Sequence, residues 1–392
     1  MKFDQDLALI KDVVERRDPA FDAVPPEAMQ AHWRVLEDAA GSGRRDAFLL
    51  AAMRLIACPG NGHTRLIPNA AISTLPIRFV ALGGGIYATQ VPEDAHAARD
   101  LPLVAVNDVP TDMLWRRIEL YLAGVPQRQR VIGPIMLAWP AAIARLTDRP
   151  PEAPVTYQFE RATGGHVSLP ITAENTMPAP SLYPIYERGT LDPGEPLGPV
   201  ADASEKLTYL RLPDFSGLDP SARAAEMAQA VDAITQAPKA NIILDVRNNP
   251  GGNFFTTQPL RDALAQHWQG RRCVALVNKF TFSAAIVFVA LIKAGLKARC
   301  VIAGEAMGDA TRFYAEGDTC ALPQSGAGVR YSTAYHDWQT GKAAPNTPVE
   351  IAKQLVAAGH LEPDHTCDIT AADLRQGRDP QLDAARALCA KA

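Results

Sequence analysis

A serine that follows a turn with paired glycines is the part of this sequence best suited to chemistry. Ser283 comes roughly thirty residues after Gly251 and Gly252. Both segments follow apolar runs that predict buried strands, and an apolar run typical of a helix follows Ser283. A hydroxyl at the start of a helix lies beside backbone N–H groups, which can stabilise the oxyanion formed when it attacks a carbonyl carbon. The pattern therefore predicts acyl-transfer chemistry at Ser283.

The groups that would assist Ser283 can also be named. The oxyanion would be held by the N–H of Ala284 and by that of Gly251 or Gly252, because glycine lets a backbone approach a ligand closely. The base must come within about 3 Å of the hydroxyl. His63, in a loop rich in turn residues, is the first choice for that base. Its rivals are His336, His360 and His365.

Each of these residues also has a purely structural interpretation. Ser283 could simply cap its helix, a role that contributes about 1 kcal/mol of stability. Gly251 and Gly252 could serve only a strand-to-helix turn, braced by Asp245 and Arg247. The chemical interpretation gains weight because the serine and the glycine turn both follow strands whose carboxyl ends should share one edge of a parallel sheet.

Hydrophobic periodicity predicts the elements that would position these residues. Helices are expected over residues 4–17, 27–40 and 44–57. A small β-rich unit follows at residues 75–125, and then a hairpin at residues 155–171. From residue 206 onward, nearly continuous apolar strands alternate with helices, which is typical of a largely parallel sheet covered on both faces. The predicted fold class is therefore α/β.

The length of 392 residues favours two or three domains. We expect an N-terminal helical region at residues 1–70, a β-rich middle region at 71–200 and an α/β domain at 201–392. The proline-rich stretch at residues 177–199 is the best boundary, because proline cannot donate to a β ladder. An ordered loop across the surface is an equal alternative for this stretch.

Composition excludes several classes of partner. The net charge is −4 and no basic block is present, which argues against nucleic acid and anionic membranes. The N-terminal segment is charged throughout, and the longest apolar run, residues 284–292, is too short to cross a bilayer, so a soluble cytoplasmic protein is expected. The six cysteines are scattered and none forms CxxC, which favours reduced thiols. Histidines and cysteines lack ligand spacing, so no metal or cofactor is expected.

Four short segments together resemble a known family. They are DVRNNPGG at residues 245–252, TFSAA at 281–285, GEAMG at 304–308 and EPD at 362–364. Their order and spacing are similar to those of the C-terminal processing (tail-specific) serine peptidases and the tricorn core proteases. NGHTR at residues 61–65 resembles the Asp-Gly-His-Thr stretch of the branch that uses a histidine. The resemblance covers most of residues 40–385 and is firmest over 205–390.

The resemblance implies a crotonase-like ββα-spiral catalytic domain, an N-terminal helical unit and a small PDZ-like β unit. It also implies that Ser283 is the nucleophile and His63 the general base, with Gly251 or Gly252 and Ala284 as oxyanion donors. The tail-specific branch uses a serine–lysine dyad instead, with its lysine directly after a glycine. Here that position holds Asp309, and no lysine is present there. Lys293 is expected to be a solvated side chain, so the dyad mechanism is not expected.

The acidic residue that would orient His63 is left open by the sequence. Glu305 is the first candidate, although it could belong only to the tight turn after its strand. The other candidates are Asp309, Asp337 and Glu362. The expected function is a serine-type peptidase that acts on a peptide or a small acyl substrate, and the chain could form a homo-oligomer. The alternatives are an esterase or amidase, and a non-catalytic ligand-binding protein on the same fold.

Overall fold

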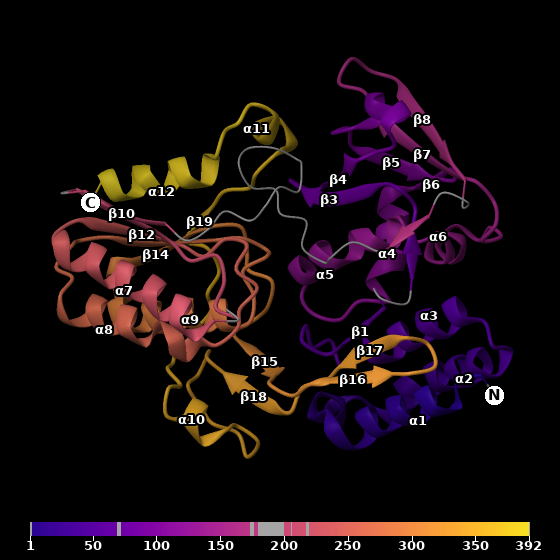
Figure 1. Cartoon of the computed structure of the whole chain (residues 1–392), viewed down its shortest axis with the longest axis horizontal. Helices are drawn as coiled ribbons and strands as arrows, with labels where there is room; N and C mark the ends of the chain where they lie inside the picture. The colour runs from indigo at the N-terminus through magenta and orange to yellow at the C-terminus, as the bar shows by residue number, and fades with distance from the viewer. Residues whose placement is uncertain are drawn as a thin grey trace. The chain divides into compact units, whose positions relative to one another are not determined.

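The chain folds into two compact units (Figure 1). Unit 1 comprises Met1–Pro184 and Tyr314–Ala334, and unit 2 comprises Ile185–Phe313 and Tyr335–Ala392. The computed structural model describes residues 2–68, 72–172, 176–178, 200–204, 206–216 and 219–391. Most of the proline-rich stretch predicted as a boundary, residues 179–199, lies outside the described residues. The predicted division into three domains stays a prediction.

Unit 1 begins with the three predicted helical segments. α1 (Asp4–Asp12) continues as a π-helical turn, η1 (Val13–Arg17), and a 3-10 turn, η2 (Pro19–Ala23), follows. α2 (Pro26–Ser42) begins with proline at its first position, where a missing N–H costs nothing. α3 (Arg45–Ile56) is buried along most of its length, which follows from its nearly continuous apolar sequence. The expected helices are therefore confirmed.

The β-rich part of unit 1 contains two small sheets. β3 (Arg78–Leu82) and β4 (Gly85–Gln90) form an antiparallel hairpin. A second sheet has the order β6-β5-β7-β8, and it includes the predicted hairpin. Its strands are β5 (Leu103–Val106), β6 (Val109–Pro110), β7 (Val155–Glu160) and β8 (His166–Ile171). The helices nearby in sequence are α4 (Thr111–Glu119), α5 (Pro126–Ile132) and α6 (Pro140–Thr147).

A later part of the chain returns to unit 1. The chain leaves unit 2 within β15 (Arg312–Ala315) and re-enters it within β18 (Ala334–Asp337). Between them, β16 (Thr319–Leu322) and β17 (Ala327–Arg330) form a hairpin. β17 also pairs antiparallel with β1 (Arg65–Ile67), which follows directly after the loop that carries His63. This pairing fixes one end of that loop.

Unit 2 is built on a six-stranded sheet in the order β10-β11-β12-β13-β14-β19. The strands are β10 (Val200–Ala203), β11 (Leu207–Arg211), β12 (Asn241–Asp245), β13 (Cys273–Val277), β14 (Cys300–Gly304) and β19 (His365–Thr366). All neighbouring pairs from β11 to β19 are parallel, and β10 is antiparallel to β11. The predicted, largely parallel sheet is confirmed, and the fold is mixed α/β.

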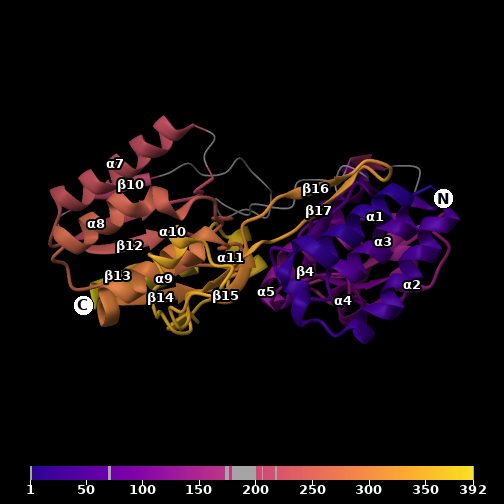
Figure 2. The same cartoon turned by 90° about the horizontal axis from the view of Figure 1, so that it is seen from below.

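Helices cover both faces of this sheet (Figures 1 and 2). α7 (Pro220–Gln236), α8 (Gln258–Gln266) and α9 (Ala284–Leu296) lie on one face, and α12 (Pro380–Ala390) lies on the other. On the α12 side, Ala385 and Cys389 pack with buried strand residues such as Val274. The two covered faces explain why every residue of β13 is buried.

The remaining named elements are short. They are β2 (Ser73–Thr74) paired with β9 (Met177–Pro178), α10 (Val349–Ala352), α11 (Ala371–Arg375), and the 3-10 turns η4 (Glu93–Ala98), η5 (Gly133–Leu137), η6 (Phe254–Thr257) and η7 (Lys297–Arg299). Among the described helices, none has both the length and the apolar composition needed to cross a lipid bilayer. The six cysteines are free thiols.

Candidate active site

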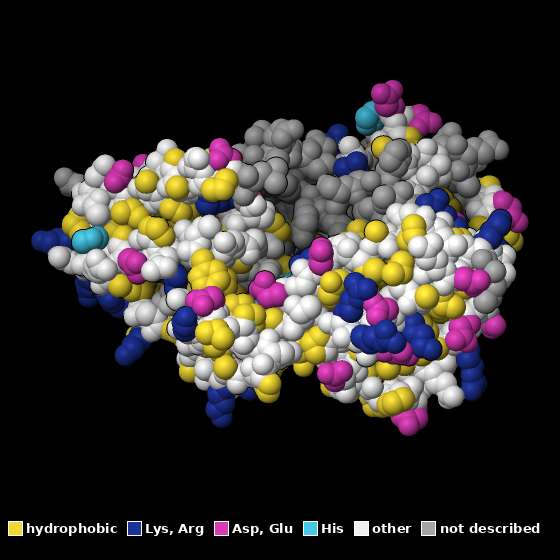
Figure 3. All heavy atoms as spheres, turned by 60° about the horizontal axis from the view of Figure 1, so that its bottom comes forward, with side chains coloured by type: hydrophobic (Ala, Val, Ile, Leu, Met, Phe, Trp, Pro, Cys, Tyr) yellow, Lys and Arg dark blue, Asp and Glu magenta, His cyan; other side chains and the backbone are white. Residues whose placement is uncertain are grey.

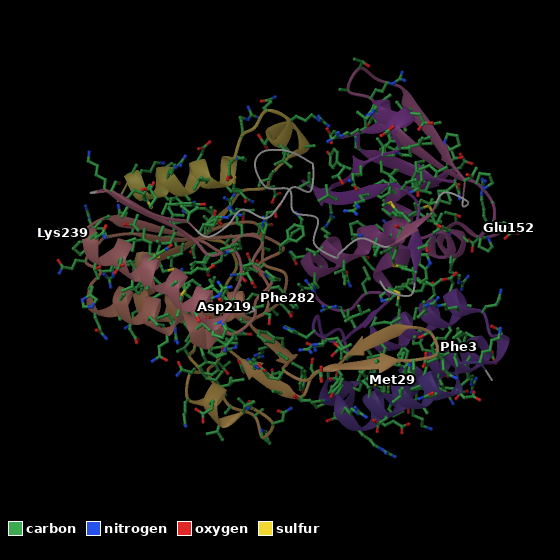
Figure 4. All side chains as sticks on the ribbon, in the orientation of Figure 1. Phe3, Met29, Glu152, Asp219, Lys239 and Phe282 are labelled. Atoms are coloured by element: carbon green, nitrogen blue, oxygen red, sulfur yellow. The ribbon has the colours of Figure 1, made fainter. Side chains whose placement is uncertain are left out.

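Ser283 lies between the turn that follows β13 and the first residue of α9. Its backbone has φ 55° and ψ −123°, a conformation that residues with a side chain rarely adopt. Its hydroxyl makes no capping hydrogen bond to the helix. Phe282, labelled in Figure 4, and Ala284 are buried on either side, whereas Ser283 is partly exposed. A plain capping role therefore does not account for Ser283, and the backbone turn presents its side chain at the surface of the unit.

Hydrogen bonds join the turn before Ser283 to the turn after β12. The Thr281 hydroxyl donates to the carbonyl oxygen of Val246 over 2.8 Å, and the N–H of Phe282 donates to that of Asn249 over 3.0 Å. The side chain of Asn278 accepts from the N–H of Asn248 over 3.0 Å. Because parallel strands β12 and β13 are neighbours, their carboxyl ends bring these turns together, as the sequence predicted.

Gly251 and Gly252 both occupy positions that exclude a side chain. Their φ angles are +102° and +128°, which favour glycine. A Cβ on residue 251 would lie 2.9 Å from the nitrogen of Ala284. A Cβ on residue 252 would lie 2.2 Å from the backbone of Phe215. The glycines therefore allow one backbone turn to approach the serine turn on one side and the segment after β11 on the other.

The N–H groups near Ser283 differ in their availability. The N–H of Gly251 donates to the side-chain oxygen of Asn249 over 2.8 Å. Within α9, the N–H groups of Ala285, Ile286 and Val287 donate to carbonyl oxygens one turn back. Among the described residues, no acceptor takes the N–H of Ala284 or that of Gly252. Of the two predicted glycines, Gly252 thus retains the free donor, while Gly251 makes the close approach.

Asp245 and Arg247 form the brace that the sequence suggested. Arg247 donates to both carboxylate oxygens of Asp245, over 3.0 and 2.7 Å, and also to Asp379 over 2.8 Å. Tyr209 donates its hydroxyl to Asp245 over 2.8 Å. Burial by itself would raise the pKa of Asp245, but Arg247 and the other donors hold that pKa below its usual value. The pair anchors the turn that carries the glycines.

Glu305, the first candidate for an orienting acid, is bound to a lysine. Its carboxylate accepts from the Lys279 ammonium over 3.2 and 3.1 Å, and both side chains are buried. Its N–H also donates to the carbonyl oxygen of Val277, the last residue of β13. Lys279 lies four residues before Ser283 in the same turn, and sequence reasoning missed it. The sequence did offer a sign of it, because Lys279 is the one charged residue among residues 278–283.

The other acidic candidates have different surroundings. Asp337 accepts two hydrogen bonds from Thr340 and forms an ion pair with Arg312 at 3.3 Å. Burial alone would raise the pKa of Asp337, but these partners lower it below its usual value. Asp309 is partly exposed and Glu362 is exposed. These three candidates and Glu305 all belong to unit 2.

Lys293 is not the solvated side chain that the sequence predicted. Its ammonium donates to the carbonyl oxygen of Cys300 over 2.9 Å and to Asp364 over 3.0 Å. The prediction was wrong because it considered the helix alone, and the partners come from β14 and from the segment before β19. Lys293 therefore ties α9 to the sheet.

His63 lies in a buried loop of unit 1 that is held by side-chain hydrogen bonds. The Asn61 amide donates to the carbonyl oxygen of Tyr314 over 3.0 Å, and Thr64 donates to Asp18 over 2.5 Å. Asp18 also accepts from the N–H of Ser332 over 3.0 Å. Burial raises the pKa of Asp18, partly offset by these donors. The loop is thus fixed on both sides of His63.

The rival histidines of unit 2 have structural surroundings. His336 is buried, stacks on Phe313 and accepts from the indole of Trp338 over 3.2 Å. His360 contacts Gln339 over 3.1 Å, and His365 is exposed in β19. His63 belongs to unit 1 and Ser283 to unit 2, so the pairing of the two stays a prediction. Within the described residues, no group of three or more potential metal ligands gathers.

Comparison with known proteins supports the sequence resemblance. The model of Peptidase family S41 matches residues 206–264, which include Gly251 and Gly252 but not Ser283. The structure of mature CPAF has a TM-score of 0.62 to this chain at 14% identity, and the alignment covers 98% of this chain and 95% of that one. Mature CPAF complexed with lactacystin has a TM-score of 0.59 at 14% identity, covering 98% and 97%. No curated protein sequence matches the chain.

At this level of identity the likeness to CPAF establishes a shared fold, and the family match adds a sequence signature over the strand β11, the helix α7 and the glycine turn. Together they support the predicted resemblance of this chain to the peptidases of family S41.

Proposed function

We propose that this protein is a serine peptidase that works through an acyl-enzyme on Ser283. The observation that carries the proposal is the backbone conformation of Ser283. It places a hydroxyl that makes no capping hydrogen bond beside the N–H of Ala284, which has no acceptor among the described residues. Strained conformations of this kind persist where the surrounding structure enforces them and are concentrated at functional sites. The S41 match and the shared fold support the same reaction class.

In the proposed reaction, the Ser283 oxygen attacks the carbonyl carbon of a peptide bond, and His63 takes the hydroxyl proton. The N–H groups of Ala284 and Gly252 donate to the oxyanion of the tetrahedral intermediate. His63 then returns the proton to the leaving amine as the C–N bond breaks. Water, activated by the same histidine, hydrolyses the acyl-enzyme and regenerates Ser283.

We propose that Glu305 supports this site through Lys279 rather than through His63. A carboxylate that already accepts two hydrogen bonds from an ammonium has less capacity to orient an imidazole. Asp309, Asp337 and Glu362 stay candidates for an orienting acid. The pair of Lys279 and Glu305 would instead fix the turn that leads to Ser283.

The finer architecture is also proposed by resemblance. Residues 201–392 would form a crotonase-like catalytic domain, supported by the parallel sheet of unit 2. Residues 71–200 would contain the PDZ-like unit, supported by the small antiparallel sheets of unit 1. The helical region at residues 1–70 would supply His63.

Labelling with a fluorophosphonate probe, followed by mass spectrometry of the modified peptide, tests the proposal. We expect the label on Ser283, and we expect Ser283→Ala to abolish both the label and the cleavage of denatured casein. His63→Ala should slow both reactions strongly. Ser221→Ala and His96→Ala, which alter an exposed serine and an exposed histidine, serve as matched controls and should react like the wild type. Unchanged casein cleavage by Ser283→Ala would overturn the proposal.

A further inference from the structure

A large groove lies on the surface of unit 2 between α7, η6 and α8. Its volume is about 1120 Å³, which exceeds the ~300–1,000 Å³ typical of small-ligand sites and suits several residues of a peptide. Apolar side chains form much of its lining, including Met227, Val231, Phe255 and Pro259. Phe255 is 36% exposed, and its ring stacks on that of the buried Phe254, so it offers an apolar surface to the groove.

The groove and the proposed catalytic centre share one residue, Gly252. Gly252, whose N–H is a proposed oxyanion donor, lines the groove, and so does Phe215. These two residues are joined by a parallel bridge: the N–H of Phe215 donates to the carbonyl oxygen of Gly251, and the N–H of Asn253 donates to that of Phe215, each over 2.9 Å. A substrate held at the oxyanion donors would therefore have its neighbouring residues at the entrance of the groove.

The charge of the groove favours a cation. Arg223 is the one basic side chain among its described lining residues, and it is already paired with Glu226 and with Asp214. Asp232 and Asp262 also line the groove, and both are exposed. Figure 3 turns this helical face of unit 2 toward the viewer, where hydrophobic side chains lie beside side chains of both charges. Two carboxylates beside an apolar floor would attract a basic side chain.

We propose that this groove binds the part of a peptide substrate next to the scissile bond, and that it selects a bulky apolar residue accompanied by Lys or Arg. The apolar side chain would pack on Phe255 and Pro259, and the basic side chain would approach Asp232 and Asp262. The inference rests on the proposed role of Ser283, because Gly252 is the residue that links the groove to the proposed catalytic centre.

The first test measures binding without turnover. The Ser283→Ala protein is titrated against a fluorescein-labelled decapeptide that contains Leu, Phe and two Arg, and against the same peptide with Glu in place of Arg, using fluorescence anisotropy. Ala228→Trp fills the groove from an exposed position on α7. We expect this change to weaken binding of the basic peptide about tenfold, as for a central contact of an interface. Asp262→Lys should remove the preference for the basic peptide.

Matched controls come from α12 on the opposite face of the sheet. Ala387→Trp and Asp383→Lys place the same side chains at exposed positions away from the groove and should leave both affinities unchanged. The melting temperatures of all variants verify folding. Equal affinities of the groove variants and the control variants for the basic peptide would overturn the groove proposal.

The second test separates this inference from the proposed reaction. Rates of fluorophosphonate labelling are measured on proteins that retain Ser283, with and without Ala228→Trp. A small probe does not need the groove, so labelling should stay within about twofold of wild type. If Ser283 is labelled but peptide binding does not depend on the groove, only the groove proposal is overturned. If peptide binding depends on the groove but Ser283 is not labelled, the proposed reaction is overturned and the groove remains a peptide-binding site.

Discussion

A Cβ atom on residue 251 would lie 2.7 Å from the Cβ of Ser283, so these two positions can be this close only with glycine at one of them. The same atom would lie 2.8 Å from the carbonyl oxygen of Phe282. The glycine turn after β12 therefore sets the distance between its backbone and the nucleophile. A substitution at residue 251 should therefore affect the reactivity of Ser283 more strongly than the rest of the fold.

Gly251→Ala is expected to slow fluorophosphonate labelling of Ser283 about 100-fold, because displacement of a reacting group by ~1 Å can cost that much. The left-handed φ of +102° should add a loss of about 1–3 kcal/mol in the free energy of unfolding. Gly295→Ala in α9 is the control, since open space surrounds that position. It should leave labelling unchanged and stabilise the protein by about 0.5–1 kcal/mol. Equal labelling of both variants would contradict the prediction.

The strained backbone of Ser283 gives a second prediction. Ser283→Gly should be about 1 kcal/mol more stable than Ser283→Ala, because glycine adopts φ 55° and ψ −123° without steric cost. Both variants should lack labelling. Lys297 has nearly the same backbone angles, φ 52° and ψ −126°, at the other end of α9. Lys297→Gly should raise the melting temperature and leave labelling intact, and a Ser283→Gly protein no more stable than Ser283→Ala would argue against stored strain.

The sequence predicted the elements of unit 2 because its strands are continuous apolar runs and its helices lie between them. It also predicted that the turn with Gly251 and the turn with Ser283 meet, since both follow neighbouring parallel strands. It could not predict the backbone angles of Ser283, because serine has no preference for positive φ and the conformation is imposed by the packed turns around it.

The sequence also could not predict contacts between residues that are far apart along the chain. Lys279 and Glu305 are 26 residues apart, and no local pattern links them. The backbone of Arg65 lies opposite that of Arg330 in the antiparallel pair of β1 and β17, and this pairing brings part of the C-terminal half into unit 1. Such pairings depend on tertiary packing, whereas periodicity reports only on the local environment of each segment.

The ion pair of Lys279 and Glu305 gives a third prediction. Lys279→Met leaves a buried carboxylate without its ammonium and should destabilise the protein by about 3–5 kcal/mol. The double variant Lys279→Met with Glu305→Leu removes both charges and should recover much of that stability. Because we assign Glu305 a positioning role, the double variant should also recover labelling of Ser283. Recovered stability with no labelling would instead favour Glu305 as an acid of the catalytic site.

A control for this cycle comes from an exposed ion pair of the same unit. Lys353 and Glu350 form a pair at 3.2 Å on the surface. The corresponding cycle of Lys353→Met and Glu350→Leu should give a coupling of only about 0.2–1 kcal/mol in chemical unfolding. A buried pair whose coupling is as small as that of the exposed pair would contradict the structural role of Lys279.

The brace of Asp245 and Arg247 predicts how stability depends on pH. Burial alone would raise the pKa of Asp245, but Arg247 holds it below the ordinary value of 3.8. A carboxylate with a depressed pKa contributes its stability above that ordinary value and loses it as the pH falls through the folded pKa. Asp245→Asn should therefore destabilise the protein by about 3–5 kcal/mol at pH 7, because it leaves the buried Arg247 with only part of its counter-charge.

Urea unfolding of the wild type and of Asp245→Asn across a pH series measures this contribution. The difference in unfolding free energy should be constant from pH 7 down to about pH 4 and should narrow below it, because wild-type Asp245 then takes up its proton. Asp383→Asn changes an exposed carboxylate on α12 and should differ from wild type by less than about 0.5 kcal/mol at every pH. A difference that stays constant into strong acid would mean that Asp245 does not titrate with unfolding, and that Arg247 anchors the glycine turn through Asp379 alone.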